Sequence, residues 1–275
     1  MPTIKNQLFI FHSIFCLLFL FLIPHHSIAQ SAEELLEQGG KFYEKDQLDS
    51  ANFFYEKAFL DKNSNIQIQA LTGLVKVALL KADLEQADSL IQVAEKLITT
   101  TTVDLKPLCK FEIIKGEYYR KNSQFKKALR QHKSVVNLSL DLEGAELIHA
   151  DALFYTALTF ERLSVFDSSL FYIDKAYTLY KQHSDTTEIK FANIYNGLGV
   201  CYYRANRYVE AKKFYLKSKE VAENKLGPVS SDLAICLSNL SSISRAEENY
   251  REGIDYCEQA LKIYNVLDDD NGKSS

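Results

Sequence analysis

The chain has 275 residues, of which 47% are hydrophobic and 25% are charged, and its net charge is −4. The hydrophobic residues suffice for a packed core, and the charges exclude a chain that is disordered or membrane-embedded throughout. The slightly acidic balance argues against a general nucleic-acid binder, which carries a basic surplus. With only four prolines and ten glycines, long helices are expected.

Residues 1–29 have the pattern of an export signal. Lys5 supplies the positive start, residues 8–23 form an apolar run, and the small residues Ser27 and Ala29 stand where signal peptidase cleaves. The apolar run is shorter than the roughly 20 residues that span a membrane. We expect cleavage after Ala29 and a periplasmic or secreted protein. The alternative is an inner-membrane anchor at residues 8–23, which would then be the chain's contact with the membrane.

The rest of the sequence repeats with a period that is mostly 41 or 42 residues. The clearest marker is a small residue, here called the anchor, at six positions: Ala51, Ala87, Ala128, Ser169, Ala211 and Gly253. A mostly small residue stands twelve positions before each anchor, and a larger or core-type side chain stands four positions after it. Offsets of three, four and seven keep residues on one helix face. Short polar breaks between two such faces predict a helix, a tight turn and a second helix in every unit.

These units predict an all-α fold, a right-handed superhelical solenoid of six antiparallel helical hairpins within residues 30–267. The predicted hairpins span residues 32–65, 68–100, 109–145, 150–183, 190–226 and 231–267, and a polar tail follows at 268–275. Gly199 and Ala211 are predicted to be contact points between two helices, with Tyr202 and Tyr215 packed beside them. Residues 99–107 read as a longer joint that bends the array.

The segment GLGVCYYRANRYVEAKKFYLKS, residues 197–218, resembles the tetratricopeptide repeat family in its Gly199, Tyr202, Ala211 and Tyr215 positions. The long period resembles the kinesin-light-chain type of repeat and the sensor arrays of bacterial regulators. The resemblance covers residues 33 to 267. It implies a concave groove, lined by the first helix of each hairpin, that binds a peptide or protein segment.

Eight residues are candidates for that groove. Their charges and amides would suit an acidic segment and the backbone of an extended peptide. They are Asn193, Asn196, Asn239, Arg120, Arg162, Arg204, Arg245 and Phe154. The alternative for the arginines is that they offset helix dipoles and pair with neighbouring glutamates such as Glu161. The alternative for the asparagines is local capping.

Catalytic or metal chemistry has no support in the sequence. No nucleophile stands in a pattern with an orienting base, and no Cys/His spacing suggests zinc. The four cysteines after residue 29 fall inside helical patterns and read as small core residues. His132 occupies a packing position and is expected to be a core histidine. We therefore expect a protein that is not an enzyme and needs no cofactor or metal.

The leading interpretation is an exported scaffold that binds a protein or peptide, without nucleic acid as a partner. One alternative is a sensor module that acts with a separate signalling protein. The other is a structural array that self-associates, because Ile254, Leu261 and Tyr264 of the last hairpin would lack full cover. That cover could come from a homodimer through the last hairpin.

Overall fold

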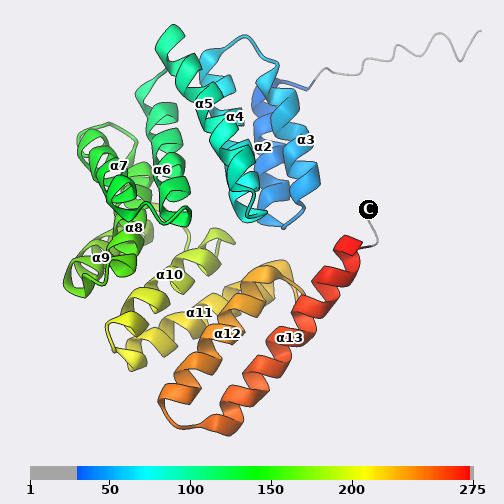
Figure 1. Cartoon of the computed structure of the whole chain (residues 1–275), viewed down its shortest axis with the longest axis vertical. Coiled ribbons are helices and arrows are strands. Elements are labelled where there is room, and N and C mark those ends of the chain that lie inside the picture. The colour runs from blue at the N-terminus through cyan, green and yellow to red at the C-terminus, as the bar shows by residue number, and fades with distance from the viewer. Residues whose placement is uncertain (1–29, 273–275) are drawn as a thin grey trace, which may run out of the picture.

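The computed structural model describes residues 30–272, so the predicted signal and the last residues of the tail lie outside it. This part of the chain contains twelve α-helices and no strand, arranged as six antiparallel hairpins (Figure 1). The hairpins are α2 (Ala32–Glu44) with α3 (Leu48–Phe59), α4 (Ser64–Leu80) with α5 (Leu84–Thr100), α6 (Leu105–Lys121) with α7 (Phe125–Ser139), α8 (Glu146–Arg162) with α9 (Phe166–His183), α10 (Lys190–Arg204) with α11 (Tyr208–Leu226), and α12 (Ser231–Ala246) with α13 (Tyr250–Gly272).

The predicted all-α solenoid of six hairpins is confirmed, and the boundaries differ by about one helical turn. The second, third and fourth hairpins begin at Ser64, Leu105 and Glu146, each four residues before the predicted start. The repeat pattern marks only the positions that contact a neighbour. The first turn of these helices lies before the first repeated offset, so the pattern does not reveal it.

All six hairpin turns share one backbone geometry. The residue five positions before each anchor has a φ of 57° to 60°, in the left-handed region. These residues are Asp46, Ala82, Ser123, Ser164, Asn206 and Glu248. The N–H group of the next residue donates a hydrogen bond to the carbonyl oxygen of the residue nine positions before the anchor. In the third hairpin, Gln124 N–H donates to Tyr119 O at 2.8 Å. This Schellman closure reverses the chain without a glycine at the left-handed position.

Inside each hairpin, the side chain four positions after the anchor packs against the residue twelve positions before it. A Cβ added at Gly39 would lie 2.7 Å from the Tyr55 ring, and one at Gly199 would overlap the Tyr215 ring. Glycine therefore makes room for an aromatic ring, which explains the predicted contact at Gly199. Gly116 makes the same room for His132.

His132 is the core histidine that was expected. It has no exposed surface, its Nδ1 lies 3.1 Å from Thr159 Oγ1, and its Nε2 lies 3.2 Å from Ile113 O. Burial lowers the pKa of His132 to about 4. The ring is therefore neutral at physiological pH and serves packing.

Consecutive hairpins meet through four positions of each second helix, which we call the joint positions. They lie one, four, eight and eleven residues after the anchor. In α5, Asp88 accepts the Tyr118 hydroxyl at 2.8 Å, and Glu95 pairs with Lys115 at 2.8 Å. In α7, His132 is hydrogen-bonded to Thr159 at 3.1 Å, and Ser139 is hydrogen-bonded to His149 at 3.0 Å. Each contact joins a second helix to the first helix of the next hairpin.

The joint between α5 and α6 packs least closely of the five. Its linker, residues 101–104, is as short as the linkers at 60–63 and 227–230, so the prediction of a longer joint is wrong. Asp88 and Glu95 occupy two joint positions of α5 and bond to Tyr118 and Lys115 of α6.

The array also closes on itself. The hydroxyl of Ser231, at the start of α12, donates to the carboxylate of Asp46 in the first hairpin turn. This contact joins the first and the sixth hairpin.

Candidate binding surface

The first helices of the hairpins line the inner side of the array. Each contacts the first helix of the next hairpin, as α4 contacts α6 and α6 contacts α8. The second helices make no comparable contacts with one another among the described residues, so they lie on the outer side (Figure 1). The inner surface formed by α2, α4, α6, α8, α10 and α12 is the candidate binding surface.

The three predicted asparagines lie together on α10 and α12. Asn239 Nδ2 donates to Asn196 Oδ1 at 2.6 Å, and Asn193 Nδ2 donates to Asp232 Oδ2 at 3.3 Å. Asn239 keeps its carbonyl oxygen, and Asn196 keeps its amide N–H groups, without a partner among the described side chains. Asn239 can therefore still accept a hydrogen bond from a peptide backbone, and Asn196 can still donate one.

The four predicted arginines do not form one row. Arg120 and Arg245 precede their anchors by eight residues, whereas Arg162 and Arg204 precede theirs by seven. One residue of difference rotates a side chain by about 100° around a helix. The equal spacing in the sequence therefore does not place the arginines on one line.

Two of the arginines already have carboxylate partners. Arg120 makes two bonds of 2.6 Å to buried Glu117, and Arg204 lies 2.9 Å from buried Glu161 of the neighbouring hairpin. Arg162 stacks over the Phe125 ring at 5.5 Å. Arg245 is exposed and has no ion pair within the described part of the chain. Arg120 and Arg204 thus show the pairing with neighbouring glutamates that was the alternative for the arginines.

Phe154 is a core residue, which corrects its predicted role in the groove. Its side chain is 8% exposed and packs edge-on against Tyr180, with ring centres 6.3 Å apart. A Cβ added at Gly197 would lie 2.5 Å from the Phe154 ring. The apolar pattern could not distinguish a groove from a contact between hairpins, because both use the same helix face.

A polar centre on the inner surface was missed by the sequence analysis. Tyr180 donates to the carboxylate of Asp151 at 2.6 Å. Burial raises the pKa of Asp151, although the Tyr180 hydrogen bond and the charges of Lys76, Lys190 and Lys110 oppose this rise. Lys110 and Asp151 stand eighteen residues before their anchors, the same register as Asn193. That shared register is the signal that could have found them.

Lys76 is the most distinctive group of this centre. Its ammonium lies 5.9 Å from the centre of the Tyr43 ring, and burial lowers its pKa. No carboxylate of the described residues lies within ion-pair distance of it. Asp151 and Glu44 act on this half-buried ammonium only at longer range, so a closer anionic group from outside would be favoured.

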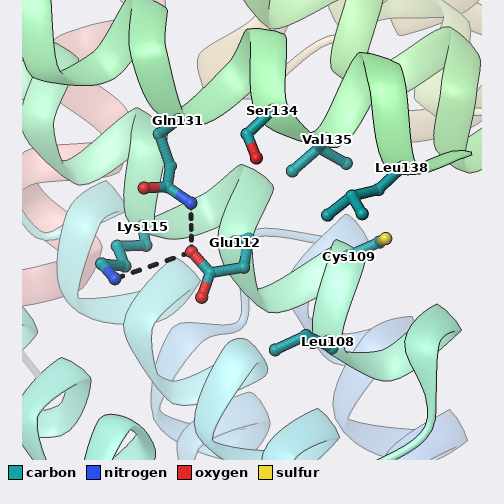
Figure 2. Close-up of a pocket in the computed structure, with 8 residues that line it drawn as sticks. All are labelled: Leu108, Cys109, Glu112, Lys115, Gln131, Ser134, Val135 and Leu138. Atoms are coloured by element: carbon teal, nitrogen blue, oxygen red, sulfur yellow. Dashed lines mark hydrogen bonds and ion pairs between the residues drawn. The ribbon is translucent and has the colours of Figure 1, made fainter.

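A separate cavity of about 310 Å³ lies between α6 and α7. Figure 2 shows Glu112 between Lys115 and Gln131, with Leu138 and Leu108 at the other end. Burial raises the pKa of Glu112, while Lys115 at 3.6 Å and Gln131 satisfy its carboxylate. These polar groups satisfy one another, so the cavity gives no sign of a missing ligand.

Within residues 30–272, no cluster of three or more His, Cys, Asp or Glu residues could hold a metal ion. The same part of the chain has no helix that is both long and apolar enough to cross a membrane. Its four cysteines are free, and only Cys257 is exposed.

Comparisons with known proteins agree with this architecture. Residues 190–265 match the family model described as tetratricopeptide repeat. A search of curated proteins found no match.

Solved structures share the fold at low sequence identity. BtubC (BKLC) from P. vanneervenii is 16% identical, with a TM-score of 0.59 over 86% of this chain and 92% of that one. PilW, a type IV pilus biogenesis factor, is 12% identical, with a TM-score of 0.54 over 86% and 98% of the two chains. A tetratricopeptide repeat protein of Thermus thermophilus is 17% identical, with a TM-score of 0.54 over 76% and 99%. Together with the six hairpins, these likenesses show that the chain has the helical-hairpin solenoid fold of tetratricopeptide repeat proteins, and its residues 190–265 are similar in sequence to that family.

Proposed function

We propose that this protein binds an extended, acidic segment of another protein along its inner surface. Tetratricopeptide repeats generally form non-catalytic scaffolds for protein–protein interaction. The observation that carries the more specific proposal is Lys76, a half-buried lysine over the Tyr43 ring with no ion-paired carboxylate among the described residues. A carboxylate of the bound segment would supply the missing partner, and binding would take place in the exported compartment that residues 1–29 suggest.

The inner surface offers two kinds of contact to such a segment. At α10 and α12, the free halves of Asn196 and Asn239 can bond to the segment's backbone, which gives affinity without requiring a particular side chain. Further along, Lys76 and Lys110 face an Asp151 carboxylate that is already held by Tyr180. Glu44 and Glu188 also lie near these lysines, and Lys190 is paired with Glu188 at 2.9 Å. The proposed preference for acidic side chains therefore depends on Lys76, which has no carboxylate within ion-pair distance.

The test is selection of short peptides from a random library on the purified full chain, followed by affinity measurement for the best binder. We expect acidic residues to be enriched. Lys76→Met, which keeps the length of the side chain, should weaken binding about ten-fold, which corresponds to about 1.4 kcal/mol. Asn196→Ala with Asn239→Ala should weaken binding of all selected peptides to a similar extent.

The matched control is Lys126→Met, because Lys126 is an exposed lysine of the outer helix α7. It removes the same charge and should leave the affinity unchanged. If Lys76→Met and Lys126→Met weaken binding equally, the effect is one of net charge and the inner-surface site is wrong. If the selected peptides show no acidic preference, the proposed partner class is wrong.

A further inference from the structure

Helix α13 exposes an apolar stripe at all four joint positions. Ile254 is 58% exposed, Leu261 is 60% exposed and Tyr264 is 38% exposed. Cys257 completes the set and is also exposed. In the other second helices these positions meet the first helix of the next hairpin.

The composition of this stripe matches joints that are covered. In α9 the four joint positions are Leu170, Ile173, Tyr177 and Tyr180. The Tyr177 and Tyr180 rings there contact Tyr195 and Phe191 of α10, with ring centres 6.0 and 6.1 Å apart. Two other second helices have charged residues at two joint positions, Asp88 and Glu95 in α5 and Lys212 and Lys219 in α11, whereas α13 has none. The stripe on α13 thus has the chemistry of a helix–helix contact, and no described helix covers it.

The opposite end of the array has a different chemistry. First helices receive the preceding hairpin at residues such as Tyr155 and Thr159, which lie fourteen and ten positions before the anchor. In α2 the equivalent residues are Glu37 and Lys41, which are exposed and paired with each other at 2.6 Å. This end is polar and suited to water.

That contrast excludes stacking of copies end to end. Such stacking would bury Glu37 and Lys41 against Leu261 and Ile254, and burying charges against apolar groups is unfavourable. A two-fold axis avoids this mismatch, because it brings the same surface of both copies together.

We propose that the stripe on α13 binds α13 of a second copy in an antiparallel pair around a two-fold axis. Tyr250, Ile254, Cys257, Leu261 and Tyr264 follow one another at spacings of four, three, four and three residues, the pattern of a two-helix seam. In an antiparallel pair centred near residue 259, Cys257 faces Leu261 of the partner subunit. Ile254 then faces Tyr264 of the partner subunit. The contact is separate from the inner surface and does not depend on the proposed peptide binding.

The first test is sedimentation of the purified full chain over a range of concentrations. The expected result is a mass that rises to twice that of one chain. Leu261→Glu should restore the mass of a single chain, because it places a carboxylate in the centre of the seam.

The control for this test is Phe171→Glu. Phe171 is 55% exposed on α9 but occupies no joint position, so this variant should still dimerise. Circular dichroism would verify that both variants remain folded. A single-chain mass at every concentration overturns the proposal, and so does a dimer that survives Leu261→Glu.

The second test concerns orientation. The test uses Cys16→Ser as its unmodified chain, which removes the cysteine of residues 1–29. Cys109, Cys201 and Cys236 are buried, so oxidative cross-links in the folded protein report on Cys257. The variant Leu261→Cys should form a covalent dimer between the new thiol and Cys257 of the partner subunit. The unmodified chain should form little covalent dimer, because its two Cys257 thiols do not face each other. Efficient cross-linking of the unmodified chain would show a parallel pair and overturn the antiparallel arrangement.

Discussion

At the scale of single residues, the hairpins depend on matching side-chain sizes across two helices. Tyr215 fills the space that Gly199 leaves, and Ile173 fills the smaller space beside Ala157, where both side chains have no exposed surface. Each of the three glycines at this position, Gly39, Gly116 and Gly199, lies against a ring. This complementarity explains why the repeat tolerates glycine inside a helix, although glycine lowers helix propensity.

We expect Gly199→Ala to lower the free energy of unfolding by about 2 kcal/mol, because the new methyl group overlaps the Tyr215 ring. In a Tyr215→Ile background, the same substitution should be neutral or stabilising, since that pair reproduces Ala157 with Ile173. Urea denaturation of the two single variants and the double variant would measure the coupling.

The matched control for this cycle is Gly40→Ala. A Cβ at Gly40 has only the Tyr55 hydroxyl nearby, at 3.9 Å. Alanine there should stabilise the helix by about 0.5–1 kcal/mol. Additive effects of the Gly199 and Tyr215 substitutions would contradict the size-matching explanation.

At the scale of elements, the hairpin turns carry an unfavourable backbone conformation six times. Non-glycine residues in the left-handed region cost about 1 kcal/mol each, and all six turns place such a residue there. Asn206 tolerates the region better than Ala82 or Glu248, because asparagine enters it more readily. Contacts on both sides of each turn hold this conformation in place.

Ala82→Gly should therefore raise the free energy of unfolding by about 0.5–1 kcal/mol. Ala82→Val should lower it by about 1 kcal/mol, because a β-branched side chain fits the left-handed region poorly. Ala82 is exposed, so neither variant changes core packing. Thermal and urea denaturation would both show the difference.

Lys45→Gly provides the comparison, because Lys45 is exposed, lies directly before Asp46 and has a φ of −98°. Glycine should bring no gain there. A similar gain from both glycines would mean that backbone strain at Ala82 is not the cause.

At the scale of the whole molecule, the contact between the first and sixth hairpins joins groups of like charge. Burial raises the pKa of Asp232 to about 6, and the charge of Asp46 adds to this rise. Asp46 also accepts the Ser231 hydroxyl. The closure of the array thus contains a carboxyl group that ionises near neutral pH.

The raised pKa fixes the sign of the pH dependence. The folded state retains a proton on Asp232 up to about pH 6, whereas the unfolded chain releases it near the ordinary value of 3.8. Stability from this group is therefore fully present below pH 3.8 and is lost as the pH rises to about 6. Above that pH the carboxylate is ionised in both states, and the penalty stays constant.

Asp232→Asn should consequently raise the free energy of unfolding at pH 8 by about 1–3 kcal/mol and change it little at pH 4. Chemical denaturation at both pH values would check this expectation. Asp46→Asn should produce a smaller gain at pH 8, since it removes only the repulsion. An equal gain from Asp232→Asn at both pH values would show that ionisation of Asp232 is not responsible.

The sequence by itself determined the hairpins, because they depend on contacts between residues close along the chain. The anchors, the small residues before them and the larger residues after them lie within one hairpin, so their offsets reveal two facing helices. The roles of Gly199 and His132 followed from the same offsets. The three asparagines lie on α10 and α12, and their use in binding remains a prediction.

Only the tertiary structure decided what happens between hairpins. Arg204 meets Glu161 of another hairpin, and Ser231 meets Asp46 across 185 residues of sequence. Such contacts depend on the twist from one hairpin to the next. A shift of a single residue turns a side chain by about 100°. The small rotation at each joint accumulates over six repeats, and no local offset in the sequence records that sum.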